Sequence, residues 1–168
     1  MRLLLLPIAV VFCCHAHADM SSFRTGPVFE DYGPVADVDV SIPVADDAVF
    51  RHSFDVGTRA EEGQPNSTLV SAARFINMHA RAGVDTDRIE VAVVVHGKAI
   101  DDVSGATPGS AELVAALIDQ GVKIYVCGQT AAYYGVAKKD LLPGVELALS
   151  AMTMHALLQQ EGFTLNPF

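Results

Sequence analysis

Seven residues from Ile89 to Val95 read Ile-Glu-Val-Ala-Val-Val-Val, and this run constrains the fold more than any other part of the sequence. β-branched residues favour strands, and a strand with almost no polar residues must be covered on both faces. Parallel sheets with helices on both sides provide such cover, whereas a strand with one face in water alternates polar and apolar residues. The run therefore predicts a central strand of an α/β domain.

Strand-like and helix-like segments alternate along the rest of the chain from Ala48 onward. Further strands are expected at 49–56, 122–126 and 145–149. Helices are expected between turn and capping residues, at 66–83, 109–121, 130–139 and 150–160. Such alternation implies a mainly parallel sheet with helices on both faces. In sheets of this kind, ligand-binding and catalytic residues lie at the carboxyl ends of the strands.

Length and charge limit the function classes. The chain has 168 residues, 51% of them hydrophobic, which suits one domain with a substantial core. Twenty acidic residues face 11 basic ones, for a net charge of −9, and this argues against a nucleic-acid surface or a basic membrane patch. Three cysteines are too few for a disulfide scaffold.

The first 18 residues have the parts of a secretory signal peptide. Arg2 precedes an apolar run over residues 3–14, and Ala16-His17-Ala18 resembles a cleavage site. The run is shorter than the roughly 20 residues that span a bilayer, so no membrane anchor is expected. Lipid attachment at Cys13 or Cys14 is the alternative. Bulky Phe12 before Cys13 disfavours it, and so does Cys13 before Cys14, because a small residue is expected at that position. We therefore expect export to the periplasm, with cleavage after Ala18.

Residues 19–47 have the composition of an extended acidic arm. Pro27, Pro34 and Pro43 break helices there, yet many valines make the segment too apolar for a free linker. Packing along the domain or a neighbouring subunit is one interpretation, and a partly ordered leader is the other. The expected organisation is a signal peptide (1–18), an arm (19–47) and one α/β domain (48–168).

Cleavage would leave a single cysteine, Cys127, between an expected strand and an expected helix. A thiol near a helix N-terminus meets unpaired N–H groups, which favour its thiolate form. Gly128 permits the turn, and Thr130 is expected to cap the helix. The alternative is an inert buried cysteine, because free cysteines are among the most buried residues.

His96 closes the most apolar strand and is the second candidate for chemistry. Its imidazole could accept a proton from Cys127 or hold a metal ion with it. The alternative is a histidine satisfied by a backbone carbonyl. His52, His79 and His155 are weaker candidates, and the last two are expected to be ordinary surface or boundary residues. No His-x-x-x-His or Cys-x-x-Cys spacing supports a metal site.

Several segments in this order resemble the DsrE/DsrF-like family, in particular its exported members. They are Gly33-Pro34-Val35, Phe54-Asp55-Val56, Val93-Val94-Val95-His96-Gly97, Ile124-Tyr125-Val126-Cys127-Gly128-Gln129-Thr130 and Gly144-Val145. The resemblance implies a three-layer α/β/α domain with a mainly parallel sheet of about five strands. It also implies assembly into homotrimers or homohexamers.

The same resemblance implies a sulfur carrier or sulfurtransferase that holds sulfur as a persulfide on Cys127. His96 and Gln129 would position groups or handle protons, and no further cofactor is implied. The partner would be a sulfur donor or acceptor protein, or a small sulfane-sulfur compound. One alternative is a non-catalytic oligomeric module that holds a soft metal or small ligand through Cys127 and His96. Another is an assembly protein without chemistry.

Overall fold

The computed structural model describes residues 20–105 and 109–166 of the chain, and the expected signal peptide lies outside these residues. The strands are β1 (Phe23–Arg24), β2 (Val35–Ala36), β3 (Phe50–Val56), β4 (Ile89–Val95), β5 (Lys123–Cys127), β6 (Glu146–Ala148) and β7 (Thr164–Asn166). The helices are α1 (Ser67–Arg81), α2 (Ala111–Asp119), α3 (Gly128–Tyr134) and α4 (Ala151–Gln160). Short 3-10 helices are η1 (Thr86–Arg88), η2 (Gly97–Val103) and η3 (Lys138–Asp140). None of the described helices is long and apolar enough to cross a bilayer.

Five strands form the main sheet in the order β6-β5-β4-β3-β7, and each neighbouring pair is parallel. The predicted α/β fold with a mainly parallel sheet of about five strands is confirmed. β4 covers the seven residues of the β-branched run. β7 was not among the expected strands, because three residues are too few for a hydrophobic pattern to emerge.

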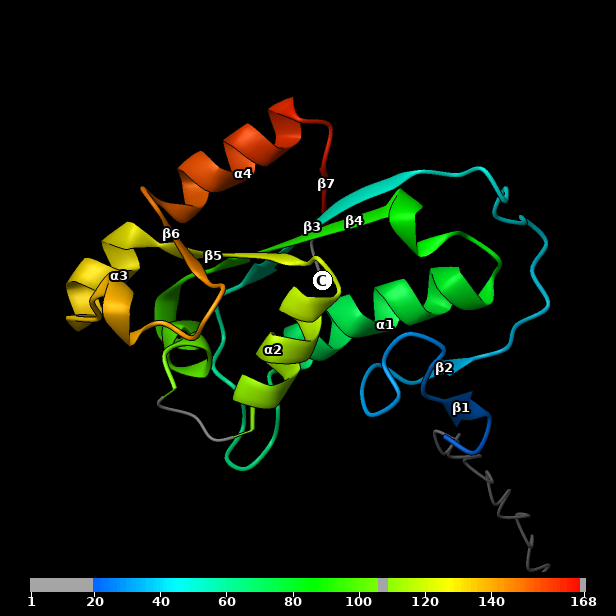
Figure 1. The fold of residues 1–168 in the computed structure, drawn as a ribbon, viewed down its shortest axis with the longest axis horizontal. Coiled ribbons are helices and arrows are strands. Elements are labelled where there is room, and N and C mark those ends of the chain that lie inside the picture. Colours follow the sequence, from blue (N-terminus) through cyan, green and yellow to red (C-terminus); the bar gives the residue numbers. More distant parts are fainter. Residues whose placement is uncertain (1–19, 106–108, 167–168) are drawn as a thin grey trace, which may run out of the picture.

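Helices lie on both faces of this sheet, with α1 and α2 on one side and α4 on the other (Figure 1). Alternate residues of β4 enter different cores. Val93 and Val95 join the larger core, which α1 and α2 cover. Ala92 and Val94 join a smaller core with Leu158 of α4. Burial on both faces explains why β4 carries so few polar residues.

Local sequence signals explain where α1 begins and ends. The side chain of Asn66 accepts hydrogen bonds from the N–H groups of Thr68, at 3.0 Å, and Leu69, at 3.4 Å. These contacts satisfy two of the N–H groups that a helix leaves unpaired at its start. The helix ends at Arg81, and Gly83 follows with a left-handed backbone (φ +96°).

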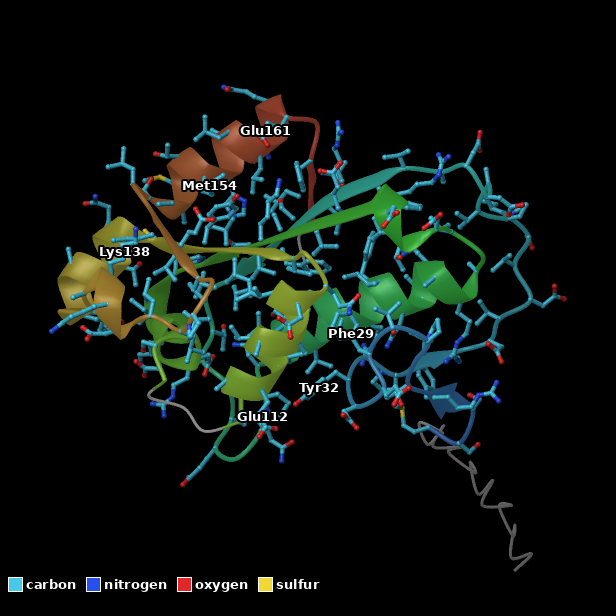
Figure 2. All side chains as sticks on the ribbon, in the orientation of Figure 1. Phe29, Tyr32, Glu112, Lys138, Met154 and Glu161 are labelled. Atoms are coloured by element: carbon cyan, nitrogen blue, oxygen red, sulfur yellow. The ribbon has the colours of Figure 1, made fainter. Side chains whose placement is uncertain are left out.

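Asn77 of α1 holds the segment that precedes the sheet. Its buried side chain accepts hydrogen bonds from the N–H groups of Val28, at 3.0 Å, and Phe29, at 2.9 Å. It also donates to the carbonyls of Phe29, Tyr32 and Gly33 at 2.9–3.1 Å. Phe29 and Tyr32 accordingly lie beside the helical layer (Figure 2). The amino-terminal part of the arm thus packs along α1.

The helix after Cys127 differs from the expected one at both ends. It begins at Gly128 instead of Thr130, so the strand runs directly into the helix without a loop. It ends at Tyr134, because Gly135 adopts a left-handed backbone (φ +70°) and the next turn, η3, is a separate 3-10 helix. The predicted helix to Lys139 is therefore wrong beyond its first two turns.

Candidate functional site

Cys127 is the last residue of β5 and immediately precedes α3, at the carboxyl edge of the sheet. The residue is 6% exposed. Tyr125 packs against the core beneath α4, and Cys127 lies two residues further along the same strand. Because strand residues alternate between faces, the thiol is directed to the α4 side of the sheet.

Hydrogen-bond donors surround the thiol. They are the hydroxyl and backbone N–H of Thr130 and the backbone N–H groups of Gln129 and Ala151. Burial raises the pKa of the Cys127 thiol, but these donors outweigh burial and hold the pKa below its ordinary value. Donors stabilise the thiolate because it is a strong hydrogen-bond acceptor. The prediction that this position favours a thiolate agrees with this environment.

Two helices supply these donors, and Gly128 lets them meet. A Cβ on Gly128 would lie 2.5 Å from the carbonyl oxygen of Ala148 and 3.1 Å from that of Leu149. Only glycine therefore permits the connection between β6 and α4 to pass so close to α3. This close approach brings the Ala151 N–H, at the start of α4, to the thiol.

Gln129, a predicted site residue, contributes mainly through its backbone. Its side chain is exposed and donates to the carbonyl of Leu149 at 3.2 Å. Its backbone N–H is one of the donors at Cys127. The Gln129 side chain therefore links α3 to the connection between β6 and α4 through a hydrogen bond.

Thr130 does not cap the helix as expected. Its hydroxyl oxygen accepts a hydrogen bond from the Gly97 N–H at 3.2 Å, while the hydroxyl also bonds to Cys127. Thr130 thus joins the end of β4 to the thiol. Cys127 itself occupies the N-cap position of α3.

His96 directly follows β4, with its backbone next to that of Cys127, but its ring turns to β3 on the other side of β4. The β4–β5 register pairs Val95 with Val126, so the following residues of the two strands lie side by side. The Nε2 atom of His96 lies 3.0 Å from Oδ2 of Asp55 on β3. His96 is not among the groups that lower the pKa of the thiol. Within the described residues no hydrogen bond joins His96 to Cys127, so the expected direct proton transfer between the two side chains has no support in this geometry.

Glycine creates the space for this ring. A Cβ on Gly57 would lie 2.7 Å from Cε1 of His96, so any other residue at position 57 would displace the imidazole. Gly97 follows the histidine with a left-handed backbone (φ +58°), which non-glycine residues rarely adopt. The ring position of His96 is therefore fixed by the backbone on both sides.

Asp55 also binds a second histidine, which the sequence analysis dismissed. Nε2 of His155, on α4, lies 2.8 Å from Oδ1 of Asp55. His155 is expected from the sequence to be an ordinary surface or boundary residue, and its side chain, 15% exposed, lies at the boundary but is paired with Asp55. Asp55 and His155 are separated by 100 residues, so no spacing in the sequence could reveal the contact.

The Asp55 carboxylate is stabilised by its two partners. Partial burial raises the pKa of this carboxyl, but hydrogen bonds from His96 and His155 outweigh burial and hold the pKa below its usual range. An ionised carboxylate only accepts hydrogen bonds, so each Nε2 must be the donor. The two rings therefore share one tautomer, with the proton on Nε2.

No metal centre emerges from these residues. Within residues 20–105 and 109–166, no group of three or more His, Cys, Asp or Glu side chains is arranged to hold a metal ion. The alternative in which Cys127 and His96 hold a soft metal therefore lacks a third ligand from the described chain. Two ligands fall short of the four that a structural zinc site requires.

The two other histidines within the described residues, His52 and His79, lie away from this edge of the sheet. The ring of His52 stacks on that of Phe75, with their centroids 4.7 Å apart. Nδ1 of His79 lies 2.7 Å from the carbonyl oxygen of Phe75. Burial and the neighbouring His79 lower the pKa of His52. These rings form an aromatic cluster between β3 and α1.

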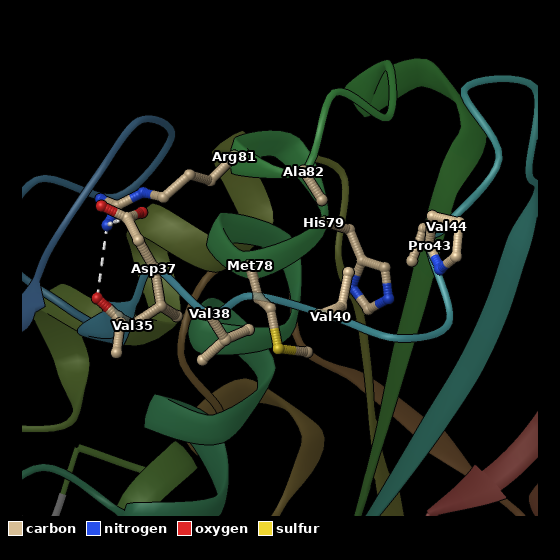
Figure 3. A pocket seen from close by; sticks show the side chains of 11 residues that line it. Val35, Asp37, Val38, Val40, Pro43, Val44, Met78, His79, Arg81 and Ala82 are labelled. Carbon is tan, nitrogen blue, oxygen red and sulfur yellow. Dashed lines mark hydrogen bonds and ion pairs between the residues drawn. The ribbon is translucent and has the colours of Figure 1, made fainter.

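An apolar groove of about 380 Å³ opens between the arm and α1 (Figure 3). Val38, Val40 and Met78 line much of it, and Arg81 and Asp37 supply charge at one end. The residues that line the groove include no cysteine, serine or threonine. It is therefore separate from the candidate site at the carboxyl edge of the sheet.

Comparison with known proteins places this geometry in context. Residues 52–167 match the model of the DsrE/DsrF-like family. No curated protein matches the chain. The fold is similar to that of a protein of unknown function, MTH1491 from Methanobacterium thermoautotrophicum, with a TM-score of 0.53 and 20% identity over 70% of this chain and 97% of that one. It is also similar to the ychN protein from E. coli, with a TM-score of 0.51 and 16% identity over 70% of this chain and all of that one (100%).

Proposed function

The chain belongs to the DsrE/DsrF-like family, and from this membership we propose that it carries sulfane sulfur as a persulfide on Cys127. The family is associated with sulfur relay. The observation that carries the proposal is the set of donors around the thiol, from Thr130, Gln129 and Ala151. An inert cysteine in an apolar core would have a raised pKa, whereas these donors lower it.

The proposed chemistry moves sulfur without any external oxidant or reductant. During loading, the Cys127 thiolate attacks the sulfane sulfur of a donor, and a bond forms between Sγ and that sulfur. The bond from the sulfur to the rest of the donor breaks, and the electron pair leaves with the donor. During unloading, the acceptor attacks the terminal sulfur and the electron pair returns to Sγ. The donors around Sγ favour this last step because they stabilise the returning thiolate.

Export and self-association are further parts of the proposal. The signal-peptide pattern of residues 1–18 supports export to the periplasm. Exposed apolar side chains support a homotrimer or homohexamer, since Ile42 on the arm is 86% exposed and Met152 on α4 is 80% exposed. The partner is a donor or acceptor of sulfane sulfur, either a protein or a small compound.

Mass spectrometry of protein purified from the periplasm tests these points together. We expect a mature chain that begins at Asp19 and a Cys127 peptide that is heavier by ~32 Da, with reductant removing the added mass. The variant Cys127→Ser should carry no added sulfur. An unmodified Cys127 that stays unmodified after incubation with polysulfide would contradict the carrier function. A metal ion that copurifies and is lost in Cys127→Ser would support the binding-module alternative instead.

A further inference from the structure

Asp55 binds two imidazoles, one of them on His96, whose backbone lies next to that of Cys127, and the sulfur-carrier proposal gives these three residues no role. Asp55 on β3 accepts from His96 at 3.0 Å and from His155 at 2.8 Å. The three residues come from β3, the end of β4 and α4, and all lie on the α4 side of the sheet. In open α/β sheets ligands bind at the edge where the strands end, and these residues lie at that edge.

Because the Asp55 carboxylate can only accept hydrogen bonds, it determines which nitrogen of the His96 ring is left to accept a proton. Because Nε2 of His96 donates to Asp55, Nδ1 is the atom that carries the lone pair in the neutral ring. The His96 side chain is 37% exposed, so its ring is open to solution, and Nδ1 is the ring nitrogen that Asp55 does not occupy. In acyl-transfer enzymes a buried carboxylate fixes the tautomer of the catalytic imidazole in the same manner.

His155 completes the arrangement by fixing the carboxylate itself. It occupies the second oxygen of Asp55, so the carboxylate cannot rotate freely about its bond. The Nδ1 atom of His155 is buried without a hydrogen-bond partner among the described residues. A proton on this atom would be a buried donor without an acceptor, which favours the tautomer with its proton on Nε2 over the tautomer with its proton on Nδ1.

We infer that His96 Nδ1 is the base that removes the proton from an incoming thiol, and that Asp55 and His155 are positioning residues for this ring. The inference rests on the proposed persulfide function. The thiol loses its proton to Nδ1, its sulfur attacks the terminal sulfur on Cys127, and the electron pair of the broken S–S bond returns to Sγ. The proton then leaves Nδ1 for water. The titratable groups around His96 are Asp55 of β3, His155 of α4, Cys127 of β5 and the exposed Lys98 of η2.

Two sulfur acceptors, a small thiol and sulfite, distinguish a role of His96 as a base from a purely structural role. A small thiol must lose a proton before it attacks, whereas sulfite near neutral pH presents an anionic sulfur nucleophile. The wild-type protein is first loaded with polysulfide and freed of excess, and the added ~32 Da on Cys127 is verified. Single-turnover transfer to N-acetylcysteine and to sulfite is then measured at about pH 7.5. A wild-type protein that gains no sulfur overturns both proposals at this first step.

In loaded His96→Gln, transfer to the thiol should fall by at least tenfold, since general bases contribute about 10²- to 10⁴-fold. Asp55→Asn should show a smaller loss, and Asp119→Asn, an exposed control with the same charge change, should show none. Transfer to sulfite should stay within about twofold in all three variants. Above the pKa of the thiol, about 8.5 for cysteine, His96→Gln and wild type should converge. Equal losses with both acceptors, or no loss with the thiol, would overturn the inference.

A measurement without turnover gives an independent result. Nitrogen NMR of the histidine rings should place the proton of His96 on Nε2 in wild type, and a mixture of tautomers should appear in Asp55→Asn. The variant His155→Gln should shift the same signals to a smaller extent. A wild-type His96 with its proton on Nδ1 would overturn the inference even if a transfer variant failed to fold.

Discussion

The Thr130 hydroxyl accepts a hydrogen bond from the Gly97 N–H at 3.2 Å and bonds to the thiol of Cys127 as well. One side chain therefore connects the backbone that follows His96 to the candidate nucleophile. The two strand ends are coupled through this hydroxyl, although no direct hydrogen bond joins His96 to Cys127 within the described residues. The connection makes Thr130 the first residue to test.

Replacing Thr130 by valine keeps the shape of the side chain and removes its hydroxyl. The pKa of Cys127 should rise, because a hydrogen bond that lowers it is lost while burial remains. Alkylation by iodoacetamide at neutral pH should slow by about tenfold, since a hydrogen bond to a charged group is worth about 1.5 kcal/mol or more. The variant Thr130→Ser, which retains the hydroxyl, should alkylate like wild type. Equal pH profiles for Thr130→Val and wild type would contradict this prediction.

Gly128→Ala should weaken the same site by a different route. Helix propensity favours alanine by about 1 kcal/mol, but a Cβ placed 2.5 Å from the Ala148 carbonyl oxygen must displace backbone. We expect a net loss of about 1–3 kcal/mol in the free energy of unfolding. The alkylation midpoint should also move to higher pH, since the Ala151 N–H retreats from the thiol. The exposed control Ala132→Gly should lose stability without moving the midpoint, and a variant more stable than wild type would refute the clash.

Asp55→Asn should reduce stability near neutral pH only. The folded-state pKa of Asp55 is lowered, so its stabilising contribution is present above the unfolded value of about 3.9 and is lost as pH falls through the folded value. The side chain is 42% exposed, so solvent screening keeps the effect modest. Thermal unfolding between about pH 3 and pH 7 should show a difference in Tm that disappears in acid. A difference independent of pH would show that the charge of Asp55 is not the cause.

Asn77→Ala should release the arm from α1. The substitution leaves several buried backbone groups without partners, among them the N–H of Phe29 and the carbonyls of Tyr32 and Gly33. We expect a loss of about 1–3 kcal/mol or more in the free energy of unfolding, together with faster proteolysis within residues 20–47. Ser71→Ala removes a hydroxyl that donates only within α1 and is the matched control. Unchanged proteolysis would mean that the arm is held by apolar contacts alone.

Much of the fold could be read from short stretches of sequence because their signals are local. The β-branched run of β4 and the Asn66 cap of α1 each depend on neighbours within a few residues. Cys127 could be identified in the same way, since a strand end followed by Gly128 marks a turn at the carboxyl edge. β7 escaped prediction because its pairing with β3 is visible only in three dimensions.

The chemistry around the site depends on long-range contacts and could be predicted only in part. His96 is a candidate from the sequence, but its hydrogen-bond partner in the structure is Asp55 on the neighbouring strand instead of Cys127. The contact between Asp55 and His155 requires α4 to cross the sheet, and hydrophobic periodicity does not determine where a helix crosses. The Ala151 donor depends on the same crossing.

The burial of Cys127 has a consequence for how the carrier meets its surroundings. With only 6% of the residue exposed, bulky disulfides and oxidised proteins have little access to the empty thiol. A bound sulfur atom extends the side chain by an S–S bond of about 2.05 Å. If the protein carries sulfur as proposed, the empty form would keep Sγ away from solution. The loaded form would then expose only the added sulfur atom to the acceptor.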